Sequence, residues 1–283
     1  MRLTGGVHSE VKFIRCPATA QIEHYQICEK SVQSIQFPVK IYPSKFAPKE
    51  PNTASDNLKP VKSAAEKTKK CPLQIHDCGL AEYRQILNLQ HELREKRHQD
   101  KIPNTVLIVE HPAVITLGAR QSFNKLLVGR ELLTQKHIDV VDIRRGGGTT
   151  AHNPGQLVFY PILHLHQLDL GISEYIRELE AIGIELLKQL GLYSSRRKGF
   201  PGLWVGTKKI ASIGVRVSKS TTYHGMAINI KNDLSIFDFI APCGLDDVEM
   251  TSVLKETGKN CSMSQIKKNL AELLTKHFKP NEA

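Results

Sequence analysis

Residues 144–156, RRGGGTTAHNPGQ, place three consecutive glycines between a pair of arginines and a lone histidine. Glycine lets backbone amides approach a ligand directly, so the stretch could cradle a phosphate, act as a hinge or form the wall of a pocket. A phosphate loop follows GxxxxGK[ST] or GxGxxG and leads into a helix, and neither pattern occurs here. The sequence therefore predicts a wall between two strands, with a mobile surface turn as the alternative.

A second polar segment, KKIASIGVRVSKSTTYHG, begins next to Lys209 and alternates like a strand in its first half. A lysine at the start of a strand is usually a solvated edge residue. An ammonium group can also activate a neighbouring nucleophile, so both interpretations stay open for Lys209. His224 and Gly225, at the end of the segment, are a second histidine in a glycine setting.

Cys243 follows Pro242 and precedes Gly244, in the segment FIAPCGLDD. A free cysteine is commonly a small buried hydrophobic residue. A rigid residue before it and a permissive one after it suit a presented nucleophile better than a core position. Among the six cysteines no other has such a setting, and their scattered spacing favours free thiols in a reducing compartment.

His164 and His166 form an HxH pair on a predicted strand. They could bind a metal ion, but no cysteine or carboxylate follows at a suitable spacing. We therefore expect them to be structural, and we expect no metal ion or other cofactor.

The elements that must position these residues are mixed without regular alternation, which favours an α+β domain over a doubly wound sheet. Helical spacing begins at Leu80 and runs to Arg94, and a further helix is expected at 173–190, with Ser173 as its N-cap and Gly191 as its stop. Two helices close the chain, at about 248–257 and 264–277. Strands are expected at 104–109, 112–117, 139–143, 156–163, 202–206, 208–217 and 222–230.

The positive charge is concentrated near the N-terminus. The net charge is +11, and residues 1–70 hold 12 Lys/Arg against 6 Asp/Glu. Residues 1–39 partly match a mitochondrial presequence, with acidic residues that such segments usually lack. Residues 40–70 predict a disordered basic linker. The remaining segment, 71–283, is mildly basic, which fits acidic protein partners; no apolar run is long enough to cross a bilayer.

Taken together, RGGGTTAHNPGQLVFYP, KKIASIGVRV with YHGMAINI, and PCG resemble the lipoyl(octanoyl) transferase family, over about residues 72–275. The resemblance implies a biotin/lipoyl protein ligase-like mixed sheet flanked by helices. It implies transfer of an octanoyl group from octanoyl-acyl carrier protein to a lysine of lipoyl domains. Those domains belong to 2-oxoacid dehydrogenase subunits and to the glycine-cleavage H protein.

The same resemblance assigns roles to residues. Cys243 takes the position of the nucleophile that forms an acyl thioester, and Lys209 that of the lysine that activates it. The substrate-binding positions are Arg145, Gly146, Gly147, Gly148, Thr149, Thr150, Ala151, His152, Ser212, Ile213, Gly214, His224, Gly225 and Met226. The sequence leaves open whether Lys209 acts as an ammonium ion beside a thiolate or as a neutral base.

Two positions depart from the commoner family pattern. Ala151 stands where an aromatic residue usually precedes the histidine, which raises the question of acyl-chain length. Asn153 replaces the glycine of HGPGQ, and asparagine tolerates left-handed backbone well enough to keep the turn.

Three rival functions remain. The nearest is an ATP-dependent lipoate- or biotin-protein ligase of the same fold, which would not need Cys243. A non-catalytic scaffold for lipoyl proteins and a nucleic-acid-binding module are the others, the last suggested by charge alone. We expect a monomeric acyltransferase that binds neither nucleic acid nor membrane, located in the mitochondrion, with the cytoplasm as the alternative.

Overall fold

The computed structural model describes residues 13–15, 73–241 and 248–279. Three sequence predictions fall outside these residues: the linker 40–70, Cys243, and the N-terminal segment 1–39 except for its strand β1 (Phe13–Arg15). Within the described residues, eight strands form a mixed sheet in the order β1-β2-β3-β7-β11-β10-β9-β8. Three more form a small sheet in the order β5-β4-β6.

The large sheet joins strands from both halves of the described chain. Its first strands, β1, β2 (Gln74–Leu80) and β3 (Thr105–Glu110), are parallel. From β3 onward every neighbouring pair is antiparallel: β7 (Gln156–Ile162), β11 (Thr221–Asn229), β10 (Lys208–Ser218), β9 (Phe200–Val205) and β8 (Ser195–Arg197). The small sheet holds β4 (Val114–Leu117), β5 (Asp139–Asp142) and β6 (Thr150–His152).

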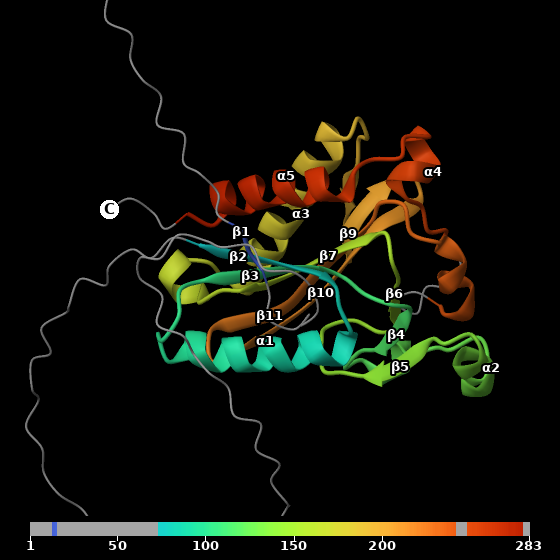
Figure 1. The fold of residues 1–283 in the computed structure, drawn as a ribbon, viewed down its shortest axis with the longest axis horizontal. Coiled ribbons are helices and arrows are strands. Elements are labelled where there is room, and N and C mark those ends of the chain that lie inside the picture. The colour runs from blue at the N-terminus through green and yellow to red at the C-terminus, as the bar shows by residue number, and fades with distance from the viewer. Residues whose placement is uncertain (1–12, 16–72, 242–247, 280–283) are drawn as a thin grey trace, which may run out of the picture. The chain divides into compact units, whose positions relative to one another are not determined.

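Helices cover both faces of the large sheet (Figure 1). The helix α1 (Tyr83–His98) lies on one face, where Ile86 packs against Leu107, Val158 and other alternate residues of the strands. The helices α3 (Ile172–Gln189) and α5 (Met263–His277) lie on the other face, over the largest hydrophobic cluster. The expected α+β mixed sheet flanked by helices is thus confirmed. The short helix α2 (Arg130–Gln135) lies beside the small sheet. The short helix α4 (Val253–Thr257) follows Ser252.

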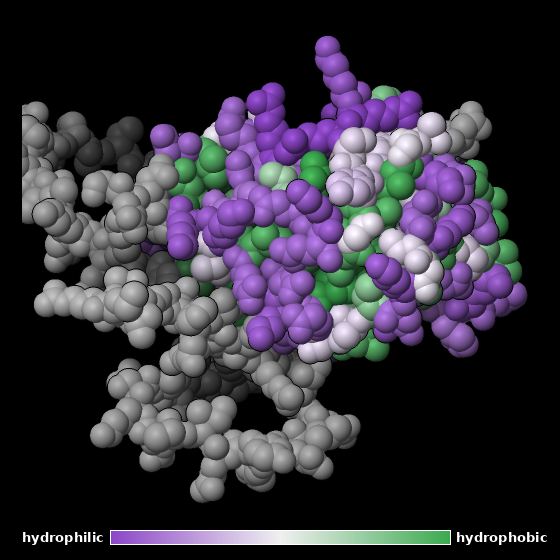
Figure 2. Space-filling view, turned by 90° about the horizontal axis from the view of Figure 1, so that it is seen from above, coloured by the Kyte–Doolittle hydropathy of each residue, from purple (hydrophilic) through white to green (hydrophobic). Residues whose placement is uncertain are grey.

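The side that carries α3 and α5 is largely hydrophilic at its surface. Figure 2 shows hydrophilic residues over most of the described part of this face, with smaller apolar areas between them. Beneath it, Tyr175, Leu179, Ile182 and Leu186 of α3 are fully buried. This amphipathic division is what the helical spacing of 173–190 predicts. No helix among the described residues has the length and hydropathy to cross a membrane.

Several element boundaries differ from the sequence expectations. Leu80 ends strand β2, so α1 begins at Tyr83. The N-cap of α3 is Gly171, and Ser173 is already inside the helix, so the cap prediction was wrong. Gly191 does end α3: it follows the C-cap with φ +82° and donates to Lys188 O at 3.0 Å.

The helix expected at 248–257 is shorter than predicted. Its N-cap is Ser252, whose hydroxyl accepts a hydrogen bond from Lys255 N at 3.2 Å. The residues before it are extended, because Glu249 O and Thr251 N bond the backbone of Lys209 at 2.8 and 2.9 Å. A tertiary pairing with β10 therefore overrides the helical spacing of this segment.

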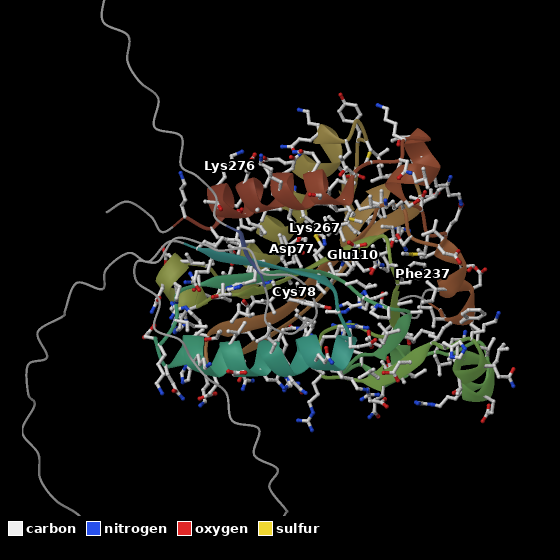
Figure 3. All side chains as sticks on the ribbon, viewed as in Figure 1. Asp77, Cys78, Glu110, Phe237, Lys267 and Lys276 are labelled. Atoms are coloured by element: carbon white, nitrogen blue, oxygen red, sulfur yellow. The ribbon has the colours of Figure 1, made fainter. Side chains whose placement is uncertain are left out.

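One partly buried ion-pair cluster ties α5 to the sheet (Figure 3), with a buried lysine between two partly exposed carboxylates. Lys267 Nζ lies 3.1 Å from Asp77 Oδ1 and 3.2 Å from Glu110 Oε1. Glu110 Oε2 also accepts a hydrogen bond from Gly155 N at 3.0 Å. Through this bond to Gly155 the cluster fixes the turn between β6 and β7.

Replacing Lys267 with Ala should destabilise the protein strongly. The change leaves two partly exposed carboxylates without the buried cation that they share, which should cost about 2 kcal/mol. The exposed pair of Lys276 and Glu185, 2.9 Å apart, offers a matched control, since Lys276→Ala should cost less than about 1 kcal/mol. Urea unfolding of both variants measures the difference, and equal losses would contradict the role of the cluster.

Candidate active site

Two adjoining cavities lie where the glycine stretch meets the large sheet. We call them the inner and the outer cavity, and Gly147, Ile213 and Gly214 line both. The sequence-predicted residues that line the inner cavity are Arg145, Gly147, Thr150, His152, Ser212, Ile213, Gly214, His224, Gly225 and Met226. Those that line the outer cavity are Gly146, Gly147, Gly148, Lys209, Ile213 and Gly214. The structure thus brings together segments that are about 60 residues apart in sequence.

The glycine stretch runs between β5 and β6 and bonds to the edge of β10, because Gly146 N donates to Val215 O at 3.0 Å. It leads into a strand, which removes the phosphate-loop interpretation. Gly147 has φ +83°, where side chains are disfavoured. A Cβ at Gly148 would lie 2.3 Å from Phe123 O. Both positions require glycine, so the stretch is a built wall of the cavities.

Arg145 supports this wall from inside. Its Nη2 donates to the carbonyl and hydroxyl oxygens of Thr116 at 2.9 and 2.7 Å, and its Nη1 donates to Gly146 O at 3.1 Å. A Cβ at Gly214 would come within 2.8 Å of Arg145 Cδ. Glycine at 214 therefore makes room for the arginine between β10 and the glycine stretch.

Three buried histidines in and beside the inner cavity are held neutral. Burial and then the charge of His111 lower the pKa of His152 to about 3, while its Nδ1 donates to Gln156 Oε1 at 2.7 Å. Burial and then the charge of Arg145 lower the pKa of His224 to about 3. Burial lowers the pKa of His111 to about 4; its Nδ1 donates to Ala81 O and its Nε2 accepts from the Tyr160 hydroxyl at 2.9 Å.

Lys209 is buried at the start of β10 and is not a solvated edge residue, since only 2% of it is exposed. Its Nζ lies 5.5 Å from the centre of the Trp204 ring, a cation–π distance. Gly202 on β9, with φ +126°, makes space beside it, because a Cβ there would lie 3.1 Å from Lys209 Cε. The backbone bonds to Glu249 and Thr251 fix where this side chain starts.

Cys243 lies outside the described residues, but the chain on either side of its segment is anchored near the outer cavity. Ala241 N donates to Lys125 O at 3.1 Å, and Leu127 N donates to Phe239 O at 2.9 Å. On the other side, residues 249–251 bond to Lys209. Lys125 follows the short helix Gln121–Phe123, whose Phe123 lines the outer cavity.

Two predicted binding residues do not line either cavity. Thr149 accepts a hydrogen bond from Lys125 N through its hydroxyl at 2.9 Å. Ala151 packs into the cluster of Ile115, Leu133 and Ile236, because alternate residues of β6 face opposite sides. Its neighbours Thr150 and His152 are the ones that face the inner cavity.

Asn153 preserves the turn in a different way from the one expected. The left-handed residue of the turn is Gly155, with φ +87°, and Asn153 is absent from the described residues with positive φ. Its side chain instead donates to Asp233 O at 2.7 Å and accepts from Asn232 Nδ2 at 3.1 Å. The departure from glycine thus adds a tie between the turn and the segment after β11.

Sequence reasoning missed the aromatic and apolar residues that complete the cavities. Tyr83, Val158, Tyr160 and Ala227 line the inner cavity. Tyr83 stacks on His152 with ring centres 5.8 Å apart. The outer cavity adds Arg120, Phe123, Ile172, Ile176, Gly199, Phe200, Pro201 and Val215. The segment GFPGLW, with glycine on both sides of Phe-Pro, was the available signal for the outer set.

His164 and His166 do not share a strand face, since His164 is the N-cap of a 3₁₀ turn, Leu165–Leu168, that contains His166. No group of three His, Cys, Asp or Glu side chains suited to a metal ion occurs among residues 73–241 and 248–279.

The three buried histidines are neutral in the folded protein. The free energy of unfolding should therefore begin to fall at pH values well above those at which carboxylates titrate. Their folded pKa values lie below the unfolded value of 6.5, so stability is complete above that pH and falls as the pH drops toward about 4. Each should contribute a slope of about 1.4 kcal/mol per pH unit. Urea unfolding between about pH 6 and 5 should show a slope smaller by that amount in His111→Gln, and an unchanged slope would contradict it.

Comparison with known proteins identifies the family. The family model of the lipoyl protein ligase A/B catalytic domain matches residues 82–275. An octanoyltransferase of Syntrophobacter fumaroxidans is 42% identical over 200 residues, 71% of this chain and 88% of that protein. An octanoyltransferase of Desulfovibrio desulfuricans is 37% identical over 205 residues, 72% of this chain and 86% of that protein.

Solved structures share the fold at low sequence identity. A lipoate-protein ligase A bound with ATP superposes with a TM-score of 0.56 at 14% identity, over 74% of this chain and 85% of that one. A bipartite lipoate protein ligase of Thermoplasma acidophilum gives 0.58 at 15%, over 73% and 83%. The sequence relatives establish the family, and the buried lysine and the adjoining cavities agree with it. The chain is an acyltransferase that belongs to the octanoyltransferase family of lipoyl protein ligase A/B catalytic domains.

Proposed function

We propose that this protein transfers an octanoyl group from octanoyl-acyl carrier protein to a lysine of lipoyl domains, in protein lipoylation. The acceptors would be 2-oxoacid dehydrogenase subunits and the glycine-cleavage H protein. The observation that carries the proposal is a buried lysine, Lys209, lining an outer cavity that adjoins the inner one. Family membership supports it, because relatives over most of the matched region are octanoyltransferases.

The proposed reaction has two acyl-transfer steps and needs no ATP. The Cys243 thiolate attacks the donor thioester carbonyl, forms a new C–S bond and releases the carrier thiol, which takes up a proton. The acceptor amine then attacks the acyl-cysteine, forms an amide and releases the Cys243 thiol. The first step exchanges one thioester for another, and the second converts a thioester into a more stable amide. Neither step therefore needs ATP to activate a free acid.

Lys209 would keep Cys243 in its reactive form. A free cysteine has a pKa of about 8.5, and an adjacent ammonium group favours the thiolate. The side chain is suited to this because Trp204, Gly202 and the bonds from residues 249–251 restrict where its amine can lie. A preset position lowers the entropic cost of reaching the reactive geometry.

The octanoyl chain would lie from the outer cavity into the inner one, past Gly147, Ile213 and Gly214. The two glycines present no side chain that would obstruct a methylene chain on this path. The chain would then meet apolar groups such as Val158 and Met226 and the neutral His152 and His224. Neutrality matters here because an apolar chain does not compensate a buried charge.

The proposed compartment is the mitochondrion, with the cytoplasm as the alternative. The relatives named above are bacterial, so this proposal depends on the composition of residues 1–70. N-terminal sequencing of the mature protein from a eukaryotic host tests it: a cleaved presequence supports import, and an intact N-terminus in the cytoplasm would refute it.

The central test is acylation of the enzyme. Incubation with octanoyl-acyl carrier protein and no ATP should add one octanoyl mass, located on Cys243 by peptide mass spectrometry. Cys243→Ala should abolish transfer, and Lys209→Ala should reduce it by about 100-fold or more. Cys261→Ala, at a half-buried free thiol, is the matched control and should keep full activity. A label elsewhere, or one that forms only with ATP and free octanoate, would replace this proposal by the ligase mechanism.

Replacing either of two alanines with valine tests the path of the acyl chain. Ala227 lines the inner cavity, whereas Ala151 is buried on the other side of its strand. Ala227→Val should lower the ratio of octanoyl to butyryl transfer several-fold, because the added methyl groups narrow the cavity. Ala151→Val should leave the ratio unchanged even if it costs about 1–3 kcal/mol of stability. Equal ratios in both variants would mean that the chain lies elsewhere.

A further inference from the structure

A basic hollow adjoins the outer cavity on the side away from the glycine stretch. It lies between the first turns of α3 and the β8–β9 hairpin. Four of its lining residues are cationic, Arg177, Arg196, Arg197 and Lys198, and the one acidic lining residue is Glu180. This concentration of positive charge has no part in the acyl-transfer steps described above.

The single carboxylate of the hollow is already fully engaged. Glu180 Oε2 accepts from Arg196 Nε at 2.9 Å, and its Oε1 accepts from Gly202 N at 3.2 Å. It therefore fixes one guanidinium group without neutralising the other cations. Arg196 Nη2 also donates to the Arg177 carbonyl at 3.1 Å, which ties the hairpin to α3.

A second guanidinium group is held by aromatic rings. Arg197 Cζ lies 5.0 Å from the ring centre of Phe200 and 4.9 Å from that of Trp204. Arginines ordered in this way recognise phosphate oxygens with little further loss of side-chain entropy. The hollow is thus suited to a phosphate group more than to a diffuse negative surface.

The hollow is continuous with the place where the thioester would react. Ile176, Gly199, Phe200 and Pro201 line both the hollow and the outer cavity. Trp204 connects them as well, since the same ring contacts Arg197 and Lys209. A linear arm whose thioester lies at Lys209 could therefore cross Phe200 and Pro201 and place a phosphate in the hollow.

We propose that this hollow binds the phosphate of the phosphopantetheine arm on which the donor carries its acyl thioester. The inference extends the proposed function and depends on it. The donor suits the hollow better than the acceptor does, because the acceptor presents a lysine, whose ammonium group the four cations would repel. The arm of a carrier protein and coenzyme A share this phosphate, so both sources are tested.

The experiment compares octanoyl donors with and without phosphate. The variant is Arg177→Glu/Lys198→Glu, at two exposed lining residues, and the matched control is Lys101→Glu/Lys268→Glu, which reverses two exposed charges that do not line the hollow. Initial rates are measured with octanoyl-acyl carrier protein, octanoyl-coenzyme A, octanoyl-phosphopantetheine and octanoyl-pantetheine. Wild type should prefer octanoyl-phosphopantetheine over octanoyl-pantetheine by about tenfold in kcat/KM.

In the hollow variant this preference should fall close to one, through KM, and kcat/KM for both the carrier protein and coenzyme A should fall about tenfold or more. The control variant should keep the wild-type preference. An unchanged preference in the hollow variant overturns the proposal. A loss confined to the carrier protein also overturns it, since that would indicate contact with the protein surface of the donor. If wild type transfers from none of the donors, the proposed function fails instead, which is a distinct result.

Discussion

The site depends on how the two edges of β10 are bonded. One edge pairs with β11 along almost its whole length, up to Ser218. The other pairs with β9 only as far as Ser212, and at Val215 the glycine stretch takes over through Gly146. Ile213 and Gly214 lie between these two partners and pair with no residue of β9, and both residues line both cavities. An interruption in a sheet edge thus connects the two cavities.

That interruption explains why so much glycine is needed. The glycine stretch must turn at Gly147, pack on Phe123 and leave room for Arg145 beside Gly214. A side chain at any of these places would close the gap or push the stretch away from β10. The buried arginine bonds mainly to backbone and to Thr116, so its charge supports the wall and helps keep His152 and His224 neutral.

Much of this could be predicted from the sequence, for reasons that differ between elements. The strands around Lys209 and His224 alternate clearly, and the glycine stretch lacks the pattern of a phosphate loop, so the wall was predictable. The burial of Lys209 was not, because it results from β9 and residues 249–251, which are close only in the fold. In the sequence Tyr83 and Tyr160 have the pattern of ordinary core residues, and the two meet at the inner cavity only because α1 packs on the sheet beside β7. The setting of Cys243 between Pro242 and Gly244 favoured a presented nucleophile, and its specific role as an acyl-thioester nucleophile comes from the resemblance.

The cluster of Lys267, Asp77 and Glu110 joins parts of the chain that are synthesised far apart in time. The bond between Lys267 and Asp77 spans 190 positions, and Glu110 passes its support on to Gly155 at the turn below His152. A nascent chain emerging from the ribosome would hold every strand of the sheet before it holds the helix that completes this cluster. Contacts of such long range form late in folding. The turn beside the inner cavity would therefore gain this support only after α5 has been synthesised.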